Sequence, residues 1–168
     1  QPALQEIVQR FGSEYLLPDG TLNRRLLAEL VFSDEQARKD LEAIMHPRIR
    51  QLGDTRLEML RRRENPPQVV VFEIPLLFET GREKDFDEIW VVVASEETAI
   101  KRAAKRDRSD EDHIRARMRA QMPVAEKARR AHVVIDNDGD WEETGRQVRQ
   151  RWRELQQRLG DKGAEERN

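Results

Sequence analysis

The sequence predicts an α/β fold in which a small sheet of parallel strands is covered by helices. Three short segments are almost wholly apolar and rich in β-branched residues, at 68–74, 88–94 and 132–136, and helical patterns lie before and between them. Strands that are apolar along their whole length are typical of parallel sheets, which are covered on both faces. The chain has 168 residues, of which 37% are hydrophobic and 38% charged, and this size predicts a single domain with a modest core.

The first third of the chain is predicted to be almost wholly helical. Gly12 is placed to end a first amphipathic helix, and Ser33, with Gln36 three residues later, predicts the start of another. His46 and Pro47 are expected to break that helix, because proline lacks the N–H that a helix needs. The helices are expected over 2–11, 24–31, 34–45 and from 47 to the pair Pro66-Pro67, with a turn at Pro18, Asp19 and Gly20 between the first two.

Helices are also predicted after the later strands. Ser95 is a suitable N-cap, and Ser109 with Asp112 forms a second capping box. Gly160 is expected to end the last helix, and the polar residues 161–168 are expected to be a disordered tail. These helices are expected over 96–106, 109–121, 123–131 and 141–159.

The run from 68 to 79 is the strongest indication of a binding site. Its apolar stretch stops at Pro75 and carries one carboxylate at Glu73 and another at Glu79. In parallel sheets, ligands bind beyond the carboxyl ends of the strands, which predicts a site near Pro75 and Leu76. The distance between the two carboxylates does not follow from their spacing, so they are not assigned as an acid–base pair.

A second indication is the cationic segment from 99 to 121. Its lysines and arginines surround a break at 107–110, and arginine can bind phosphate oxygens in a forked geometry while it stays charged. A basic helical flap of this kind suits phosphoryl transfer. Acidic residues are interleaved with the basic ones, so a solvated surface is the alternative.

Other kinds of site find little support. There are no cysteines, and the three histidines, His46, His113 and His132, match no metal-ligand spacing. A structural role is the alternative for His46. No stretch approaches the roughly 20 apolar residues of a membrane span, and the absence of cysteines makes the cytoplasm the simplest location. The sequence contains neither GxxxxGK(S/T) nor GxGxxG, so no phosphate-binding glycine loop is predicted within it.

Taken in order, several segments resemble the dephospho-coenzyme A kinase family of P-loop enzymes. They are PALQEIVQRFG, LPDGTLNRRLLAELVF, LEAIMHPRIR, VVVFEIPLLFE, KRAAKRDRSDEDHIRARMRAQMPVAEKARRA and VVIDNDG. The resemblance covers almost the whole chain. It implies a P-loop kinase-like parallel sheet with flanking helices, with a helical coenzyme A (acceptor) region at 1–67, the remaining kinase core at 68–160 and a helical lid at about 98–131.

The resemblance also implies an activity and roles for individual residues. The activity is ATP-dependent phosphorylation of the 3′-hydroxyl of dephospho-coenzyme A (dephospho-CoA), with Mg²⁺, in the last step of coenzyme A synthesis. It implies no nucleic-acid or membrane partner. In the lid, Arg102 and Arg106 would contact the phosphates as catalytic residues, and Asn137 would bind the nucleotide. The residues assigned to dephospho-CoA are Arg24, His46, Pro75, Leu76, Leu77 and Glu79.

The sequence also departs from the family pattern. The family's phosphate loop, its first two strands and its candidate catalytic aspartate are expected to lie upstream of Gln1, so we expect the chain as given to be inactive. Glu73 and His132 stand where the family often has Asp, and Ala99 where it often has Gln. Two other functions stay open: a non-catalytic coenzyme A-binding or partner module, and an arginine-rich nucleic-acid-binding protein, against which the net charge of -2 argues.

Overall fold

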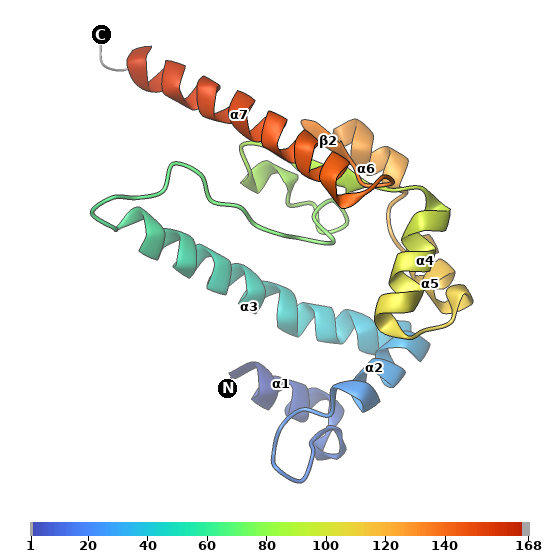
Figure 1. Cartoon of the computed structure of the whole chain (residues 1–168). Coiled ribbons are helices and arrows are strands. Elements are labelled where there is room, and N and C mark those ends of the chain that lie inside the picture. Colours follow the sequence, from blue (N-terminus) through green and yellow to red (C-terminus); the bar gives the residue numbers. More distant parts are fainter. Residues whose placement is uncertain (1, 166–168) are drawn as a thin grey trace. The chain divides into compact units, whose positions relative to one another are not determined.

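The computed structural model describes residues 2–165 and divides the chain into two compact units. Unit 1 is Gln1–Val70 and unit 2 is Val71–Asn168. Figure 1 traces the helices and strands of each unit along the chain.

Unit 1 is helical, as the sequence predicts, and consists of α1 (Pro2–Phe11), the short 3-10 turn η1 (Ser13–Tyr15), α2 (Arg24–Ser33) and α3 (Glu35–Arg61). Both α1 and α2 pack against α3. Ile7 of α1, Leu27 of α2 and Ala37 of α3 are buried and form the core of this unit. An ion pair between Arg10 and Asp40 also joins α1 to α3.

The predicted break at His46 and Pro47 is wrong, because α3 runs without interruption from Glu35 to Arg61. Pro47 removes one backbone hydrogen bond, the one that a residue at this position would donate to the carbonyl of Ala43. The φ of proline is compatible with a helix, and the turns on both sides keep their own hydrogen bonds. The 27-residue helix therefore carries the proline in its interior, at a cost of about 3 kcal/mol.

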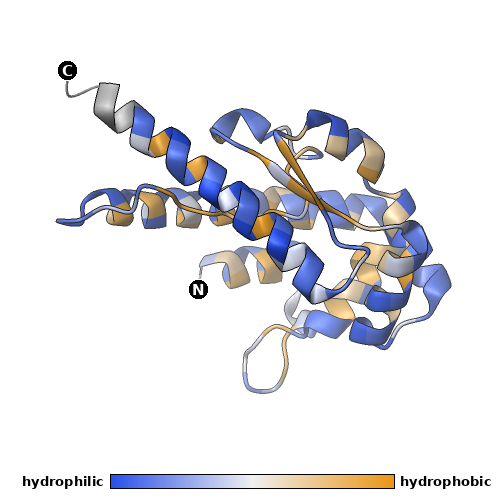
Figure 2. Ribbon diagram, turned by 45° about the horizontal axis from the view of Figure 1, so that its top comes forward, coloured by the Kyte–Doolittle hydropathy of each residue, from blue (hydrophilic) through white to orange (hydrophobic). Residues whose placement is uncertain are grey.

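Unit 2 is built around a two-stranded parallel sheet. Its elements are the 3-10 turn η2 (Glu83–Asp85), β1 (Trp90–Val93), α4 (Glu96–Asp107), α5 (Glu111–Arg119), α6 (Val124–Arg130), β2 (Val133–Asp136) and α7 (Trp141–Glu165). α7 packs on β2, α6 contacts β1, and α4 packs against α5. Figure 2 shows both strands as hydrophobic, whereas hydrophilic and hydrophobic residues alternate along α7. The buried hydrophobic residues of this unit are Phe78, Ile89, Ile100, Ile114 and Ile135.

Two of the three predicted strands are confirmed, and the third is wrong. β1 and β2 lie within the predicted segments 88–94 and 132–136 and pair with each other in parallel. Residues 68–74 form no strand, and the side chain of Val71 is largely exposed. A strand needs a neighbour that completes its backbone hydrogen bonds, and the described residues provide none for this segment. Apolar composition alone therefore overpredicts the sheet.

Two helices begin at carboxylates instead of the predicted serines. Asp34, rather than Ser33, accepts hydrogen bonds from the first backbone N–H groups of α3. The hydroxyl of Ser33 donates to carbonyls at the end of α2 instead. Asp110, rather than Ser109, caps α5, whereas Ser95 caps α4 as predicted. A serine followed by an aspartate offers two possible caps, and sequence spacing does not choose between them.

The last helix is longer than predicted. α7 continues through Gly160 to Glu165, so the prediction of a helix that ends at Gly160 is wrong, and so is that of a disordered tail over 161–165. Residues 166–168 lie outside the described part of the chain. A glycine inside a helix costs only about 1 kcal/mol relative to alanine, which is too little to end it. Within residues 2–165, no helix combines the length and the apolar character that a membrane span requires.

Glu88 joins the start of β1 to α7. Its Oε1 accepts a hydrogen bond from the indole N–H of Trp90 at 2.6 Å, and its Oε2 forms an ion pair with Arg158 at 2.7 Å. Burial raises the pKa of Glu88, but the hydrogen bonds from Trp90 and Arg158 outweigh this effect. The pKa of Glu88 therefore lies below its usual range.

We expect Glu88→Gln to lower the free energy of unfolding at neutral pH by less than about 1 kcal/mol, because Arg158 is largely exposed. The pKa of Glu88 is lower in the folded chain than in the unfolded one. The charged carboxylate therefore stabilises the fold above the unfolded value of 4.5, and this contribution is lost as the pH falls through the folded pKa. Urea unfolding of both proteins between about pH 7 and pH 3 measures the difference. A difference that stays constant over this range would contradict a contribution from the charge.

Candidate functional site

The loops that follow β1 and β2 meet at the carboxyl edge of the sheet. The backbone N–H of Asn137 donates to the carbonyl of Val93 at 2.7 Å. The N–H and the hydroxyl of Ser95 both donate to Oδ1 of Asp138, at 2.9 and 2.8 Å. Ser95 and Asp138 are 43 positions apart, as are the residues paired in the sheet. The Asp138 side chain therefore continues the strand pairing beyond Asp136.

Asp138 is a charged acceptor that links the two loops. The hydroxyl of Thr98 and the two donors of Ser95 hold the pKa of Asp138 below its usual range. Ser95 is also the N-cap of α4. The carboxylate consequently fixes the start of α4 to the turn that follows β2.

Arg102 of α4 binds the same turn from the side. Its guanidinium donates to the carbonyl of Asn137 and, at 3.1 Å, to that of Gly139. The side-chain oxygen of Asn137 lies 3.0 Å from the hydroxyl of Thr144, which is buried. The structure thus brings together Arg102 and Asn137, two residues that the family resemblance assigns to the phosphates and to the nucleotide.

An open, polar hollow of about 430 Å³ lies beside this turn. Gln147 of α7 holds one wall, because its amide donates to the carbonyl of Asp136 at 3.0 Å and accepts from the N–H of the same residue at 2.9 Å. The other lining residues are Asp136, Asp138, Gly139, Glu143 and Arg146. The hollow thus offers polar and charged groups in the segment next to Asn137.

Arg106, the second predicted lid arginine, lies at the end of α4 and is largely exposed. It forms a forked ion pair with Asp107 at 2.7 and 3.1 Å, and Arg117 of α5 contacts the same carboxylate at 2.9 Å. The hydrogen bonds from both arginines hold the pKa of Asp107 far below its usual range. Asp107 joins α4 to α5 through exposed pairs, which are weak and screened by salt.

Residues 75–81 form a single helical turn that carries most of the predicted acceptor residues. The N–H groups of Gly81 and Arg82 donate to the carbonyls of Phe78 and Leu77, each at 3.1 Å. This pair of bonds, with Gly81 at a φ of 63°, is a Schellman motif. The turn buries Phe78 in the core, leaves Pro75 exposed and leaves Leu76 and Leu77 half-buried.

Glu79, at the end of this turn, is occupied by contacts within the protein. Its Oε1 forms an ion pair with Lys127 of α6 at 2.6 Å and accepts from the backbone N–H of Met122 at 3.0 Å. Burial raises the pKa of Glu79, but the hydrogen bonds from Lys127 and from backbone N–H groups outweigh it and leave the pKa below its usual range. The carboxylate is therefore charged and held against α6.

The remaining predicted substrate residues lie in unit 1. Arg24 is the first residue of α2, and His46 lies within α3. Both are exposed. The predicted site residues are thus divided between the two units, two in unit 1 and the others in unit 2.

His132 has a structural role at the amino edge of the sheet. Its Nδ1 accepts a hydrogen bond from the backbone N–H of Ile89 at 3.0 Å, while the carbonyl of Ile89 accepts from the N–H of His132 at 2.9 Å. Ile89 and His132 are again 43 positions apart. His132 and Asp138 therefore extend the pairing of β1 and β2 at opposite ends.

Neither Asp138 nor Lys127 is predicted from the sequence to be a site residue. A signal existed for Asp138, because a parallel pairing of 88–94 with 132–136 in the observed register sets Ser95 opposite Asp138. Lys127 carries no comparable signal. Tertiary packing brings Glu79 to Lys127, and the periodicity of the sequence does not predict contacts between segments this far apart.

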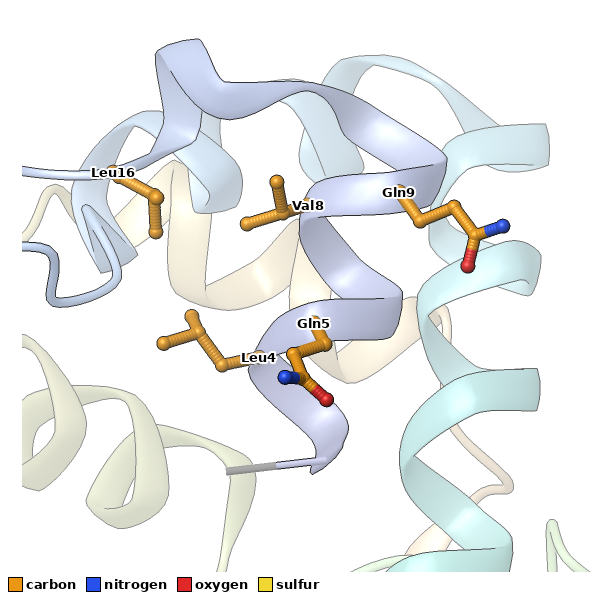
Figure 3. A pocket seen from close by; sticks show the side chains of 5 residues that line it. All are labelled: Leu4, Gln5, Val8, Gln9 and Leu16. Carbon is orange, nitrogen blue, oxygen red and sulfur yellow. The ribbon is translucent and has the colours of Figure 1, made fainter.

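A second open hollow, of about 390 Å³, lies on α1 in unit 1. Figure 3 shows Leu4 and Val8 of α1 and Leu16 of the following loop around a common space, with Gln5 and Gln9 on the same helix. None of the predicted site residues lines this hollow. Within residues 2–165, no group of three or more histidine, aspartate or glutamate side chains is arranged to hold a metal ion.

Comparisons with known proteins agree on one family. The family model for dephospho-CoA kinase matches residues 1–143. A dephospho-CoA kinase of Moorella thermoacetica is 47% identical over 161 residues, which cover 96% of this chain and 76% of the relative. That of Geobacter sulfurreducens is 45% identical and covers 89% of this chain and 75% of the relative.

Two solved structures are similar to this one. The crystal structure of TT1252 from Thermus thermophilus matches with a TM-score of 0.70 and 40% identity over 90% of this chain and 76% of that chain. The dephospho-CoA kinase from Campylobacter jejuni matches with a TM-score of 0.61 and 26% identity over 90% of this chain and 75% of that chain.

We expect Gly81→Ala to lower the free energy of unfolding by about 1 kcal/mol, because alanine adopts the left-handed φ of the Schellman motif only with strain. No heavy atom lies within 4 Å of the added methyl group, so a clash does not contribute. Gly160→Ala is the matched control: its surroundings are equally open, but it lies in a helix, where alanine should stabilise by about 0.5–1 kcal/mol. Denaturant unfolding measures both, and effects of the same sign would contradict the interpretation.

Proposed function

The chain belongs to the dephospho-CoA kinase family, and we propose that its residues supply the acceptor-binding region and the lid of this phosphotransferase. The reaction transfers a phosphoryl group from ATP to the 3′-hydroxyl of dephospho-CoA. In phosphoryl transfer the protein forms no covalent bond that the reaction requires. Catalysis therefore depends on positioning the reactants and on neutralising the charge of the phosphates. The cytoplasm is the location we propose.

The observation that carries this proposal is the joint position of Arg102 and Asn137 at the carboxyl edge of the parallel sheet. Nucleotides bind at this edge in open α/β sheets. The polar hollow beside Asn137 supports a role for the turn in holding the nucleotide. Arg106 is exposed on the same helix as Arg102 and can fork onto phosphate oxygens.

We propose that Arg24 and His46 of unit 1 contact dephospho-CoA, and we propose the same role for the turn at Pro75, Leu76 and Leu77 of unit 2. Arginine suits the phosphates of dephospho-CoA, and the apolar turn suits its uncharged parts. We assign no residue of 2–165 to Mg²⁺, since no cluster of ligands supports one there.

The sequence contains no GxxxxGK(S/T) segment, so we propose that these 168 residues bind the acceptor but do not catalyse by themselves. A coupled assay of ATP consumption with dephospho-CoA, together with calorimetry on the same chain, tests this. Saturable binding without turnover is the expected result. Turnover by the 168 residues would overturn the second half of the proposal, and absence of binding would overturn the acceptor assignment. Salt-sensitive binding to duplex DNA would favour the nucleic-acid alternative.

In a protein that carries a phosphate-binding glycine loop ahead of these residues, we expect Arg106→Ala to lower kcat/KM for phosphoryl transfer by about 100-fold, the usual loss when one donor to a developing anion is removed. Lys105→Ala is the matched control, because Lys105 is the preceding cation on α4 and has no assigned role. Its kcat/KM should stay within about twofold of the wild type, as for a surface substitution. Steady-state kinetics with both substrates varied measure the two variants, and equal losses would refute a specific role for Arg106.

A further inference from the structure

Glu79 differs from the other residues of the predicted acceptor turn, because its charged group is bound to α6. The ion pair with Lys127 joins residues 48 positions apart in the sequence, and both side chains are mostly shielded, 21% and 14% exposed. The additional bond from the N–H of Met122 ties the same oxygen to the loop that precedes α6. Both donors bind Oε1, so this oxygen holds the carboxylate in one orientation against α6 and the preceding loop.

A second ion pair reinforces the first. Glu83 lies four residues after Glu79 in the sequence and pairs with Arg130. Arg130 lies three residues after Lys127 on α6. The guanidinium of Arg130 also lies over the ring of Phe78, 4.8 Å from its centre. The turn at 75–81 and α6 are thus clamped together at two levels, around a phenylalanine of the core.

The clamp can be compared with another pair of the same chemistry. Glu97 and Lys101 also make a 2.6 Å ion pair, but they lie four residues apart on α4 and are 77% and 66% exposed. A pair of that kind contributes little, and it connects no separate segments. The Glu79–Lys127 pair therefore owes its significance to the two segments that it joins.

We propose that Glu79 is a positioning residue, which fixes the acceptor turn to the lid's far end at Met122 and Lys127 instead of contacting dephospho-CoA. This rests on the proposed function, in which residues 75–77 bind the acceptor and residues 98–131 form the lid. The clamp makes the acceptor wall and the last part of the lid move as one body. A shift of the turn against α6 would misplace the wall, and displacements of about 1 Å are costly in such sites.

The test compares substitutions on both sides of the pair in a protein that carries a phosphate-binding glycine loop ahead of these residues. Glu79→Gln keeps an oxygen for the Met122 N–H but removes the charge, and Lys127→Met removes the other partner. We expect each to raise the KM for dephospho-CoA roughly 10-fold, and the double variant to be no worse than either single one, as for residues that act through one contact. Glu97→Gln, the matched control, should leave the KM unchanged.

A second measurement follows the clamp directly. Hydrogen exchange at the amide of Met122 should speed up in Glu79→Ala, which removes both contacts, and should be unchanged in Glu97→Gln. If Glu79→Ala fails to fold, the comparison of Glu79→Gln with Lys127→Met still decides the question.

The outcomes separate the proposal from the function on which it rests. A raised KM in Glu79→Gln with a normal KM in Lys127→Met would overturn it, because Glu79 would then contact the substrate. Normal KM values in both would overturn it as well. If the loop-bearing protein without substitutions consumes no ATP with dephospho-CoA, the proposed function is refuted instead. Unchanged exchange at Met122 in Glu79→Ala would still refute the clamp.

Discussion

The parallel pairing of β1 with β2 is the constraint on which the candidate site depends. One register brings together residues 43 positions apart, and side chains extend it at both ends, through His132 at the amino edge and Asp138 at the carboxyl edge. Because Asp138 binds the N-cap of α4, the register also sets where that helix begins. Arg102 reaches the carbonyl of Asn137 because the same register places the start of α4 beside the turn that follows β2. The geometry of the nucleotide side is therefore a consequence of strand register.

The predicted lid is fixed at both of its ends. At its start, Asp138 fixes α4 to the sheet edge, and at its end Lys127 is bound to Glu79. Between these points α4 packs against α5, and Ile100 of α4 and Ile114 of α5 are both buried. The exposed pair of Arg117 with Asp107 adds little to this packing. The two helices are therefore expected to stay together through buried apolar side chains rather than through the charges around Asp107.

Much of the fold could be predicted from local patterns, and the errors have a common physical cause. The first helix, both observed strands and the N-cap at Ser95 were correct because each rests on periodicity or on a neighbouring side chain. The family could be recognised from short motifs in order. The strand predicted at 68–74 is absent because a strand needs a hydrogen-bonded neighbour, and an apolar sequence does not show whether that neighbour is present. The helix break predicted at Pro47 does not occur because a long helix tolerates the loss of one hydrogen bond.

Roles of individual residues were less predictable, because chemistry at a position depends on the partner that folding supplies. The motif assigns Glu79 to the substrate, yet in the structure its Oε1 is bound by Lys127 of α6 and by the N–H of Met122 in the loop before α6. His132 was a departure from the family's usual aspartate, yet its Nδ1 accepts the backbone N–H of Ile89 as a carboxylate oxygen could. The two acceptors are not equivalent, since an imidazole accepts only through an unprotonated nitrogen, whereas an aspartate accepts through either oxygen. The role of His132 at the amino edge therefore follows from the strand pairing that places its ring beside Ile89, and its position in the motif does not report it.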